Sequence, residues 1–251
     1  MLTALACLPL AAWIWLALAH GRFWRADQRL GDAPAPDAWP EIAILIPARD
    51  EAATIARVLE AHAASAYPGP MQVVLVDDGS SDGTGAIGRA IAERAPRPVH
   101  VLEAPPPPPG WTGKLHALAT ATAALPRLAP GARWLLLTDA DILHAPDTAA
   151  RLVAKAEAEG LSLASLMARL DARGPWGRLL IPAFVFFFQK LYPFARVNDP
   201  RDDTAAAAGG CVLLRRGALE AAGGIASIRG ALIDDCTLAA RIKHGPPRRA
   251  I

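Results

Sequence analysis

Residues 134–141 read WLLLTDAD, and this stretch decides the fold. Its apolar part, Trp134 to Leu137, is short and unbroken, which is typical of a strand buried on both faces of a parallel sheet. Four further segments have the same character: Ile42–Ile46, Gln72–Val76, Val99–Leu102 and Leu161–Met167.

Helical patterns separate these apolar runs. The segments concerned are Glu51–Ala66, Thr84–Ala95, Lys114–Leu125 and the stretch from Pro146 to Glu159. Strands that alternate with helices predict an α/β fold with a doubly wound, mostly parallel sheet and helices on both faces.

Composition narrows the function classes. The chain has 251 residues, 53% of them hydrophobic, and a formal net charge of +2. A nucleic-acid-binding protein would show a dense basic stripe, so no nucleic-acid partner is expected. Cys7, Cys211 and Cys236 are far apart and form no CxxC pair, which suits a reducing compartment.

The N-terminus predicts a membrane anchor. Leu2–Ala19 is an apolar run, and Arg22, Arg25 and Arg29 follow it. Such a run is long enough to span a bilayer, and positive charges after it favour a cytoplasmic C-terminal side. We therefore expect a single transmembrane helix over residues 1–21 in the cytoplasmic membrane, with the globular part inside the cell. A cleaved signal peptide is the alternative, but no Lys or Arg precedes the run.

A basic juxtamembrane segment and linker, residues 22–41, connects the anchor to the globular part. Gly31–Pro40 (GDAPAPDAWP) is a linker by composition.

Acidic residues follow three of the predicted strands. They lie in Pro47–Glu51, Asp77–Asp82 and Asp139–Asp141. Ligands of doubly wound sheets bind at the carboxyl ends of the strands, so these groups should meet at one edge. Because neighbouring carboxylates repel one another, a bound cation would explain their gathering there.

The Asp139-Ala140-Asp141 spacing predicts a metal site. Two residues two apart on an extended segment point to the same side. A hard divalent cation takes carboxylate oxygens and keeps positions for phosphate oxygens, so the pair suits a metal shared with a diphosphate. An ordinary loop or cap is the alternative interpretation.

Two other segments in this region resemble known binding motifs but do not fit them. Asp78–Gly83 resembles the start of an EF-hand loop, but the twelfth position is Arg89 instead of Glu. Gly83–Gly88 is a GxGxxG, but it begins seven residues after Val76 rather than directly after the strand. The better interpretation is that Asp77 or Asp78 binds a base or ribose, and that Asp82 and Thr84 cap the next helix.

Two helix starts complete the set of candidate residues. Trp111-Thr112-Gly113-Lys114 (WTGK) offers a lysine for phosphate, with a solvated lysine as the alternative. Asp234 and Asp235 begin another helix, where either one can cap and the other act as a base.

Together these motifs resemble a known family. The set IPARDE, VDDGSSDGT, WTGK, TDADI, GGCVLLRR and IDDCTLAARIK, in this order, is similar to family 2 glycosyltransferases of the GT-A fold. WTGK, YPFARVNDP and AAAAGGCVLLRR look like the hopanoid-biosynthesis-associated members. The resemblance covers about Ile42 to His244.

The resemblance implies a nucleotide-diphosphate sugar as donor, with UDP as the first candidate nucleotide. The nucleoside would lie against Ala48, Glu51 and either Asp77 or Asp78. Lys114 would neutralise phosphate. The backbone at Gly209 and Gly210 would approach the sugar.

It also implies a metal and a base. Asp139 would contact the ribose and, with Asp141, would hold Mn²⁺ or Mg²⁺ on the diphosphate. Asp235 matches the general base of an inverting transfer, with Asp234 in place of the family's more usual Glu.

The chain departs from the family after its globular domain, residues 42–245. The later QxxRW motif is absent, and residues 246–251 suggest a truncated C-terminus. The alternatives are therefore an inactive nucleotide-binding membrane protein and a nucleotidyltransferase.

The acceptor is expected to be a lipid such as a hopanoid, or another hydroxyl compound. Leu179–Phe188 (LLIPAFVFFF) is too short to span a bilayer and suits the membrane interface, with an ordinary core helix as the alternative.

Overall fold

The computed structural model describes residues 2–246 and 250–251. Met1 and residues 247–249, the latter within the predicted C-terminal segment 246–251, lie outside the described residues. The described chain forms a six-stranded sheet in the order β3-β2-β1-β4-β6-β5. Its strands are β1 (Ile42–Ala48), β2 (Met71–Asp77), β3 (Val99–Glu103), β4 (Trp134–Leu137), β5 (Leu163–Ser165) and β6 (Val212–Arg215).

The sheet is mostly parallel, as predicted. β1 pairs in parallel with β2 and β4, and β2 pairs in parallel with β3. β6 runs antiparallel to both β4 and β5, so the sheet is mixed at this side. The prediction lacked β6, although Val212–Leu214 is an apolar run of the same kind as β4.

The predicted fifth strand, Leu161–Met167, is shorter in the structure and lies at the sheet edge. β5 keeps only Leu163–Ser165. The Ser165 hydroxyl accepts the Ala208 N–H and also lies 3.2 Å from the Ala208 carbonyl oxygen, so a loop takes the place of a longer ladder.

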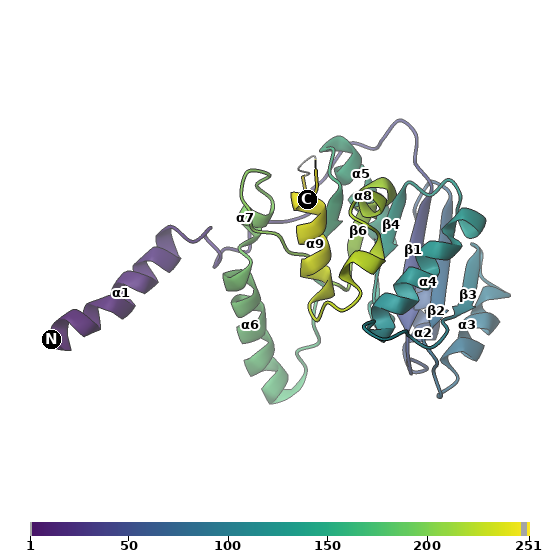
Figure 1. The fold of residues 1–251 in the computed structure, drawn as a ribbon, viewed down its shortest axis with the longest axis horizontal. Coiled ribbons are helices and arrows are strands. Elements are labelled where there is room, and N and C mark those ends of the chain that lie inside the picture. Colours follow the sequence, from purple (N-terminus) through teal and green to yellow (C-terminus); the bar gives the residue numbers. More distant parts are fainter. Residues whose placement is uncertain (1, 247–249) are drawn as a thin grey trace.

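Helices cover both faces of the sheet, as predicted. One face packs against α4 (Gly113–Leu128), α8 (Arg216–Ala221), the 3₁₀ helix η1 (Ile225–Ile228) and α9 (Asp234–His244). The other face packs against α2 (Ile55–Ala63), α3 (Thr84–Ala92) and α5 (Thr148–Ala158). Figure 1 shows α4, α8 and α9 in front of the strands.

Successive strand residues enter opposite cores, because side chains alternate across a strand. Ala43 and Leu45 of β1 belong to the core under α4 and α9, whereas Ile42, Ile44 and Ile46 belong to the core under α2 and α5. Burial on both faces explains why these strands read as unbroken apolar runs.

The first predicted helix begins later than expected. Asp50 has a positive φ of 54°, which turns the chain away from β1. Residues 52–54 then form a turn, in which the Thr54 hydroxyl donates to the Glu51 carboxylate at 2.8 Å. Regular helix starts only at Ile55.

Two apolar helices lie outside this core. α1 (Leu2–Leu18) projects away from the sheet in Figure 1, and α6 (Gly174–Leu191) precedes the short α7 (Phe194–Val197). Among the described residues, Gly174–Val197 is long and apolar enough to cross a membrane, and Cys7–Leu18 is a shorter apolar helix. None of the eighteen residues of α6, all of them described, is buried, so the interpretation as a core helix was wrong.

Two histidines meet between α2 and the loop after β4. The rings of His62 on α2 and His144 are 4.8 Å apart between centroids, and His62 is 2% exposed. Burial, and secondly repulsion from His144, lower the pKa of His62 to about 3. The folded protein therefore keeps His62 neutral at pH values at which the unfolded chain protonates it.

We predict that the protein loses stability as the pH falls below 6.5, the ordinary pKa of histidine. Between that pH and about 3, the unfolded chain binds a proton that the folded chain excludes. The loss attributable to His62 is about 1.4 kcal/mol per pH unit. Thermal unfolding in detergent over this range measures the slope, and His62→Leu should reduce it. An unchanged slope in His62→Leu would contradict the assignment.

Candidate active site

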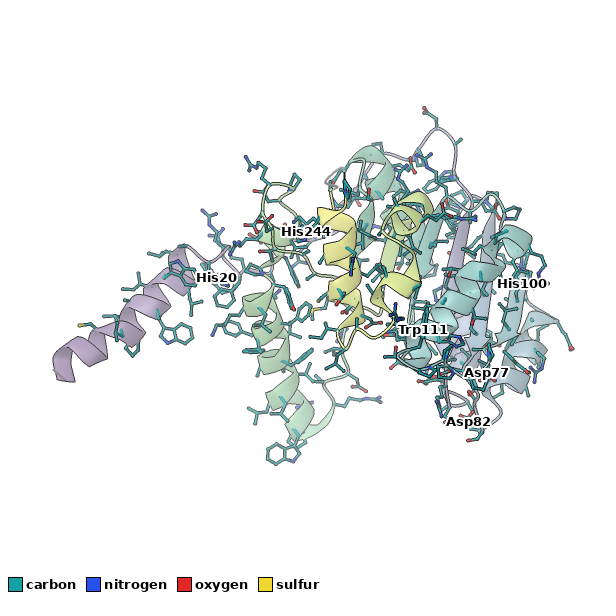
Figure 2. All side chains as sticks on the ribbon, viewed as in Figure 1. His20, Asp77, Asp82, His100, Trp111 and His244 are labelled. Carbon is teal, nitrogen blue, oxygen red and sulfur yellow. The ribbon has the colours of Figure 1, made fainter. Side chains whose placement is uncertain are left out.

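The carboxyl ends of three strands bring the predicted site residues to one edge of the sheet. The β1–β2 register sets Ala48 opposite Asp77, and the Asp78 N–H donates to the Ala48 carbonyl at 2.8 Å. The Thr138 N–H donates to the Leu45 carbonyl at 3.2 Å, which carries Asp139 to the same edge. Figure 2 shows Asp77 and Asp82 at this lower edge.

A cavity of about 530 Å³ opens there, a size that suits a small-molecule ligand. Its walls come from three strand ends and the start of α4. The lining residues are Pro47, Ala48, Arg49, Glu51, Asp78, Gly113, Lys114, Asp139, Ala140 and Asp141. A smaller cavity of about 370 Å³, between the linker and α5, contains none of the predicted site residues.

The structure separates Asp77 from Asp78. Asp77 Oδ1 accepts the Ser80 N–H at 2.9 Å, and its Oδ2 lies where a Cβ on Gly85 would be. Asp77 therefore shapes the turn into α3 and does not line the cavity. Asp78 lines it, 8% exposed, with Arg49 Nη1 3.8 Å away.

Glycines make room for these carboxylates. A Cβ on Gly113 would overlap Asp78 Oδ2, and a Cβ on Gly88 would overlap a methyl of Leu75. Gly85 and Gly88 of the GxGxxG pattern thus serve the close packing of α3 on β2. This packing explains the glycine spacing without a dinucleotide.

Hydrogen bonds join the loop after β1 to the loop after β2. The Asp50 N–H donates to Ser80 Oγ at 3.0 Å, and the Ser81 N–H donates back to Asp50 Oδ1 at 2.8 Å. Asp82 Oδ1 accepts the Thr84 N–H at 3.0 Å, and the Thr84 hydroxyl accepts the Glu51 N–H at 2.8 Å. These bonds fix the cavity wall that carries Glu51. The N-cap of α3 is Gly83, without a side-chain capping bond, so the prediction that Asp82 and Thr84 cap this helix was wrong.

Lys114 lies among three carboxylates. Its Nζ is 2.7 Å from Asp139 Oδ1 and 3.6 Å from Asp234 Oδ2. Burial alone would lower the pKa of Lys114, but Asp139, and then Asp234 and Asp235, raise it above its ordinary value. Lys114 is therefore a positive charge between the strand end and the start of α9, and it is ion-paired although more than a third of its side chain is exposed.

Asp235 is held by the backbone. Its Oδ2 accepts the Gly209 N–H at 2.8 Å and its Oδ1 accepts the Cys236 N–H at 2.7 Å. A Cβ on Gly209 would lie 3.4 Å from both Asp235 Oδ2 and Lys114 Nζ. The N-cap of α9 is Ile233, without a side-chain capping bond, so the prediction that one of the two acids caps the helix was wrong. Asp235 is held by two backbone N–H groups, whereas Asp234 faces Lys114. Both remain candidates for the base.

A partly buried junction links the Asp139 loop to the glycine loop. The Thr138 hydroxyl donates to the Gly210 carbonyl at 2.9 Å and lies 3.0 Å from His144 Nε2. Because the single Thr138 proton goes to Gly210, His144 must donate from Nε2. Thr138 and His144 therefore fix the spacing between Asp139 and Gly209.

Asp141 is the carboxylate best suited to a metal. It is exposed at the cavity and makes no hydrogen bond or ion pair within the described part of the chain. Residues 2–246 and 250–251 contain no group of three or more His, Cys, Asp or Glu side chains arranged around a common metal position. A divalent ion with one or two protein carboxylates and several phosphate or water oxygens fits this donor set.

The sequence interpretation missed three residues of the site. Arg49 lines the cavity directly after β1, and Thr138 and His144 flank the Asp139–Asp141 pair. Arg49 could have been found, since it directly follows a predicted strand. The junction of Thr138 and His144 gives no sequence signal, because its partner Gly210 is more than sixty residues away.

Comparison with known proteins agrees with this geometry. The chain matches the profile of Glycosyl transferase family 2 over residues 43–223. It is 28% identical over 136 residues to an N-acetylglucosaminyltransferase of Mesorhizobium japonicum (strain LMG 29417 / CECT 9101 / MAFF 303099), covering 53% of this chain and 30% of that protein.

Among solved structures, it is similar to the mannosyltransferase PcManGT from Pyrobaculum calidifontis in complex with GDP-Man and Mn²⁺. The TM-score is 0.70 at 27% identity, over 100% of this chain and 66% of that chain. The chain thus spans less than two thirds of the length of either relative. Because the family profile covers well over half of the chain, the protein belongs to glycosyltransferase family 2.

Proposed function

We propose that the protein is an inverting glycosyltransferase that moves a sugar from a nucleotide-diphosphate sugar to a hydroxyl group. One observation carries this proposal: a single cavity is lined by both the exposed Asp141 carboxylate and Lys114, and the Lys114 ammonium also lies 3.6 Å from Asp234 Oδ2. A site for a leaving diphosphate and a site for a base are thus neighbours. Family membership and the GDP-Man and Mn²⁺ complex of the mannosyltransferase support the same chemistry.

The donor nucleoside would lie against Ala48, Glu51 and Asp78. Asp78 and Glu51 offer carboxylate oxygens to base or ribose donors, and Arg49 lies at the cavity wall. Asp139 would contact the ribose. UDP was the first candidate nucleotide, and the GDP-Man complex of the similar mannosyltransferase makes GDP the second.

Departure of the nucleoside diphosphate breaks the bond between the anomeric carbon and the phosphate oxygen. Mn²⁺ or Mg²⁺ at Asp141, with Asp139, would stabilise the negative charge on the diphosphate. Lys114 supplies a second, fixed positive charge at the start of α4, where the helix N-terminus adds to it. Ligand binding would therefore draw Lys114 from Asp139 toward phosphate.

The acceptor hydroxyl attacks the anomeric carbon opposite the leaving group, which inverts the centre. Its proton passes to a carboxylate within hydrogen-bond reach, for which we propose Asp235. The backbone N–H groups of Gly209 and Cys236 hold that carboxylate in place. Gly209, having no side chain, would let the backbone approach the sugar, and the Thr138 and His144 contacts of Gly210 keep that loop in position.

We further propose a membrane lipid, such as a hopanoid, as acceptor. The hopanoid-type motifs WTGK and AAAAGGCVLLRR and the exposed apolar α6 support this assignment. The apolar helix α1 would anchor the chain in the cytoplasmic membrane. The basic residues after α1 favour a catalytic domain on the cytoplasmic side.

A screen of UDP- and GDP-linked sugars with membrane lipid extract tests the function directly. The expected result is a lipid whose mass rises by one sugar residue, read by mass spectrometry. The matched control is Asp235→Asn, which should give no such product. Absence of sugar transfer from every donor to every lipid would refute the lipid acceptor.

We predict that Asp235→Asn lowers turnover about a hundred- to ten-thousandfold, because Asn cannot accept the proton. Asn keeps the size of the side chain but has a single oxygen, so it can accept only one of the two backbone N–H bonds that Asp235 accepts. Donor affinity should still change little, because Asp141 and Lys114 carry the proposed diphosphate contacts. Steady-state kinetics and donor titration measure the two quantities. Asp234→Asn is the matched variant and should be milder. The reverse order would exchange the two roles, and normal turnover in both variants would exclude this pair as the base.

We predict that Asp141→Ala removes most of the metal-dependent affinity for nucleoside diphosphate. The fold should persist, since Asp141 is exposed and has no partner within the described residues. Calorimetric titration with Mn²⁺, and again with chelator, measures the effect. Asp32→Ala is the control, because the Asp32 carboxylate is fully exposed and outside the main cavity. Equal binding with and without chelator in the unmodified protein would contradict a metal role.

We predict that Gly113→Ala weakens nucleotide binding about ten- to a hundredfold, as expected for loss of a hydrogen bond to a charged group. The added Cβ would overlap Asp78 Oδ2 and displace that carboxylate from the cavity. Gly217→Ala is the matched control, since a Cβ there meets nothing within 4 Å. Nucleotide titration compares the two. Similar affinities would show that Asp78 does not hold the nucleotide.

A further inference from the structure

The exposed face of α6 is an apolar stripe. Trp176, Leu179, Leu180, Phe184, Phe187 and Leu191 are each more than half exposed. Their spacing of three and four residues sets them on one side of the helix. A contiguous exposed stripe of large apolar side chains marks an interaction surface.

Contacts between α6 and the globular domain determine which side of the helix faces outward. Phe188, on a different side of α6, and Tyr192, which directly follows the helix, are partly buried and pack against the core under α4 and α9. Their rings are 5.3 Å apart between centroids. With this side held by the domain, the stripe faces outward.

The segment after α1 packs against α6. The Phe23 and Phe186 rings are 5.1 Å apart, and the His20 Nε2 lies 2.8 Å from the Lys190 carbonyl. Lys190 Nζ also lies 5.9 Å from the ring centre of Trp13. The segment directly after α1 therefore rests on the C-terminal half of α6, and Figure 1 shows α1 projecting away while the chain after it reaches α6 beside α7.

The charges around this surface favour an anionic partner. Residues 1–31 and 169–203 together hold nine Lys or Arg and five Asp or Glu, a local excess of four positive charges, whereas the whole chain has a net charge of only +2. Arg25, Arg173, Arg196 and Arg201 pair with neighbouring carboxylates, and the remaining basic residues are Arg22, Arg29, Arg169, Arg178 and Lys190. Within α6 the charged residues are Arg178 and Lys190, both basic. Apolar and aromatic side chains on one face, with basic groups around them, are the pattern of a helix at a membrane surface.

From these contacts we propose that α6 is a second membrane contact, which lies in the interface of an anionic phospholipid bilayer and does not cross it. Moving the charged Arg178 and Lys190 side chains into the hydrocarbon centre of a bilayer would cost free energy. The side of the helix that carries Phe188, together with Tyr192, already packs against the globular domain. The helix therefore lies along the membrane plane with Trp176 to Leu191 at one shallow depth. This proposal goes beyond the anchor at α1 and does not depend on glycosyl transfer.

The position of α6 also gives the lipid acceptor of the proposed function a route to the site. Leu232 and Ile233, 96% and 54% exposed, directly precede Asp234. Apolar surface thus occurs both on α6 and next to the acids at the start of α9. This part rests on the proposed function, whereas the membrane contact itself is tested separately.

Depth measurements on the full chain in liposomes of phosphatidylcholine and phosphatidylglycerol test the contact. Cys7→Ser removes the exposed native thiol, while Cys211 and Cys236 are buried. A polarity-sensitive fluorophore is then attached at Leu180→Cys, Phe184→Cys or Phe187→Cys. Glu93→Cys, on the exposed C-terminal side of α3, is the matched control. Lipids with quenchers at different depths, and aqueous iodide, report the surroundings of each probe.

The expected result is blue-shifted emission and strong quenching by lipid-borne quenchers at all three α6 positions, at one shallow depth, with little quenching by iodide. The Glu93 probe should show the opposite. Iodide quenching of the α6 probes as strong as at Glu93 would overturn the proposal. A depth that progresses across the bilayer along α6 would instead indicate a spanning helix. Shielding from both quenchers would indicate a protein partner or second copy, and both outcomes would also overturn it.

Discussion

The ion pair between Lys114 and Asp139 is the contact on which the rest of the site depends. It joins the start of α4 to the end of β4, and the same ammonium group faces Asp234 at the start of α9. Both side chains are more than a third exposed, so the pair adds little to stability. Its importance is positional, because one positive charge lets carboxylates from two elements approach each other at a single edge of the sheet.

The second constraint on the site is the small distance between its carboxylates and the backbone. Asp77, Asp78 and Asp235 each lie close to a glycine: Gly85, Gly113 and Gly209. A side chain at Gly85 or Gly113 would overlap the neighbouring carboxylate. Acid and glycine therefore act as pairs, and each pair brings a carboxylate close to the backbone at a helix start or loop.

Much of this arrangement could be predicted from the sequence, because β1, β2 and β4 are buried on both faces and read as unbroken apolar runs. The convergence of their acidic ends then follows from the rule for parallel sheets. β6 was missed although its apolar run was visible, and its antiparallel pairing depends on tertiary contacts. The partners of Lys114 and Thr138 are distant in sequence, and the choice between Asp77 and Asp78 depends on where two helices start. The exposure of α6 was equally hidden, since an apolar helix in a core and one at a membrane have similar sequences.

We propose that this edge of the sheet breaks the bond between a sugar and a nucleoside diphosphate. Identification of the phosphorus product tests it most directly. The protein, in membranes with Mn²⁺ and a nucleotide sugar, should release nucleoside diphosphate in an amount equal to the sugar transferred. Release of pyrophosphate would indicate nucleotidyl transfer, and binding of the donor with no phosphorus product would indicate an inactive nucleotide-binding protein. Either result would contradict the account.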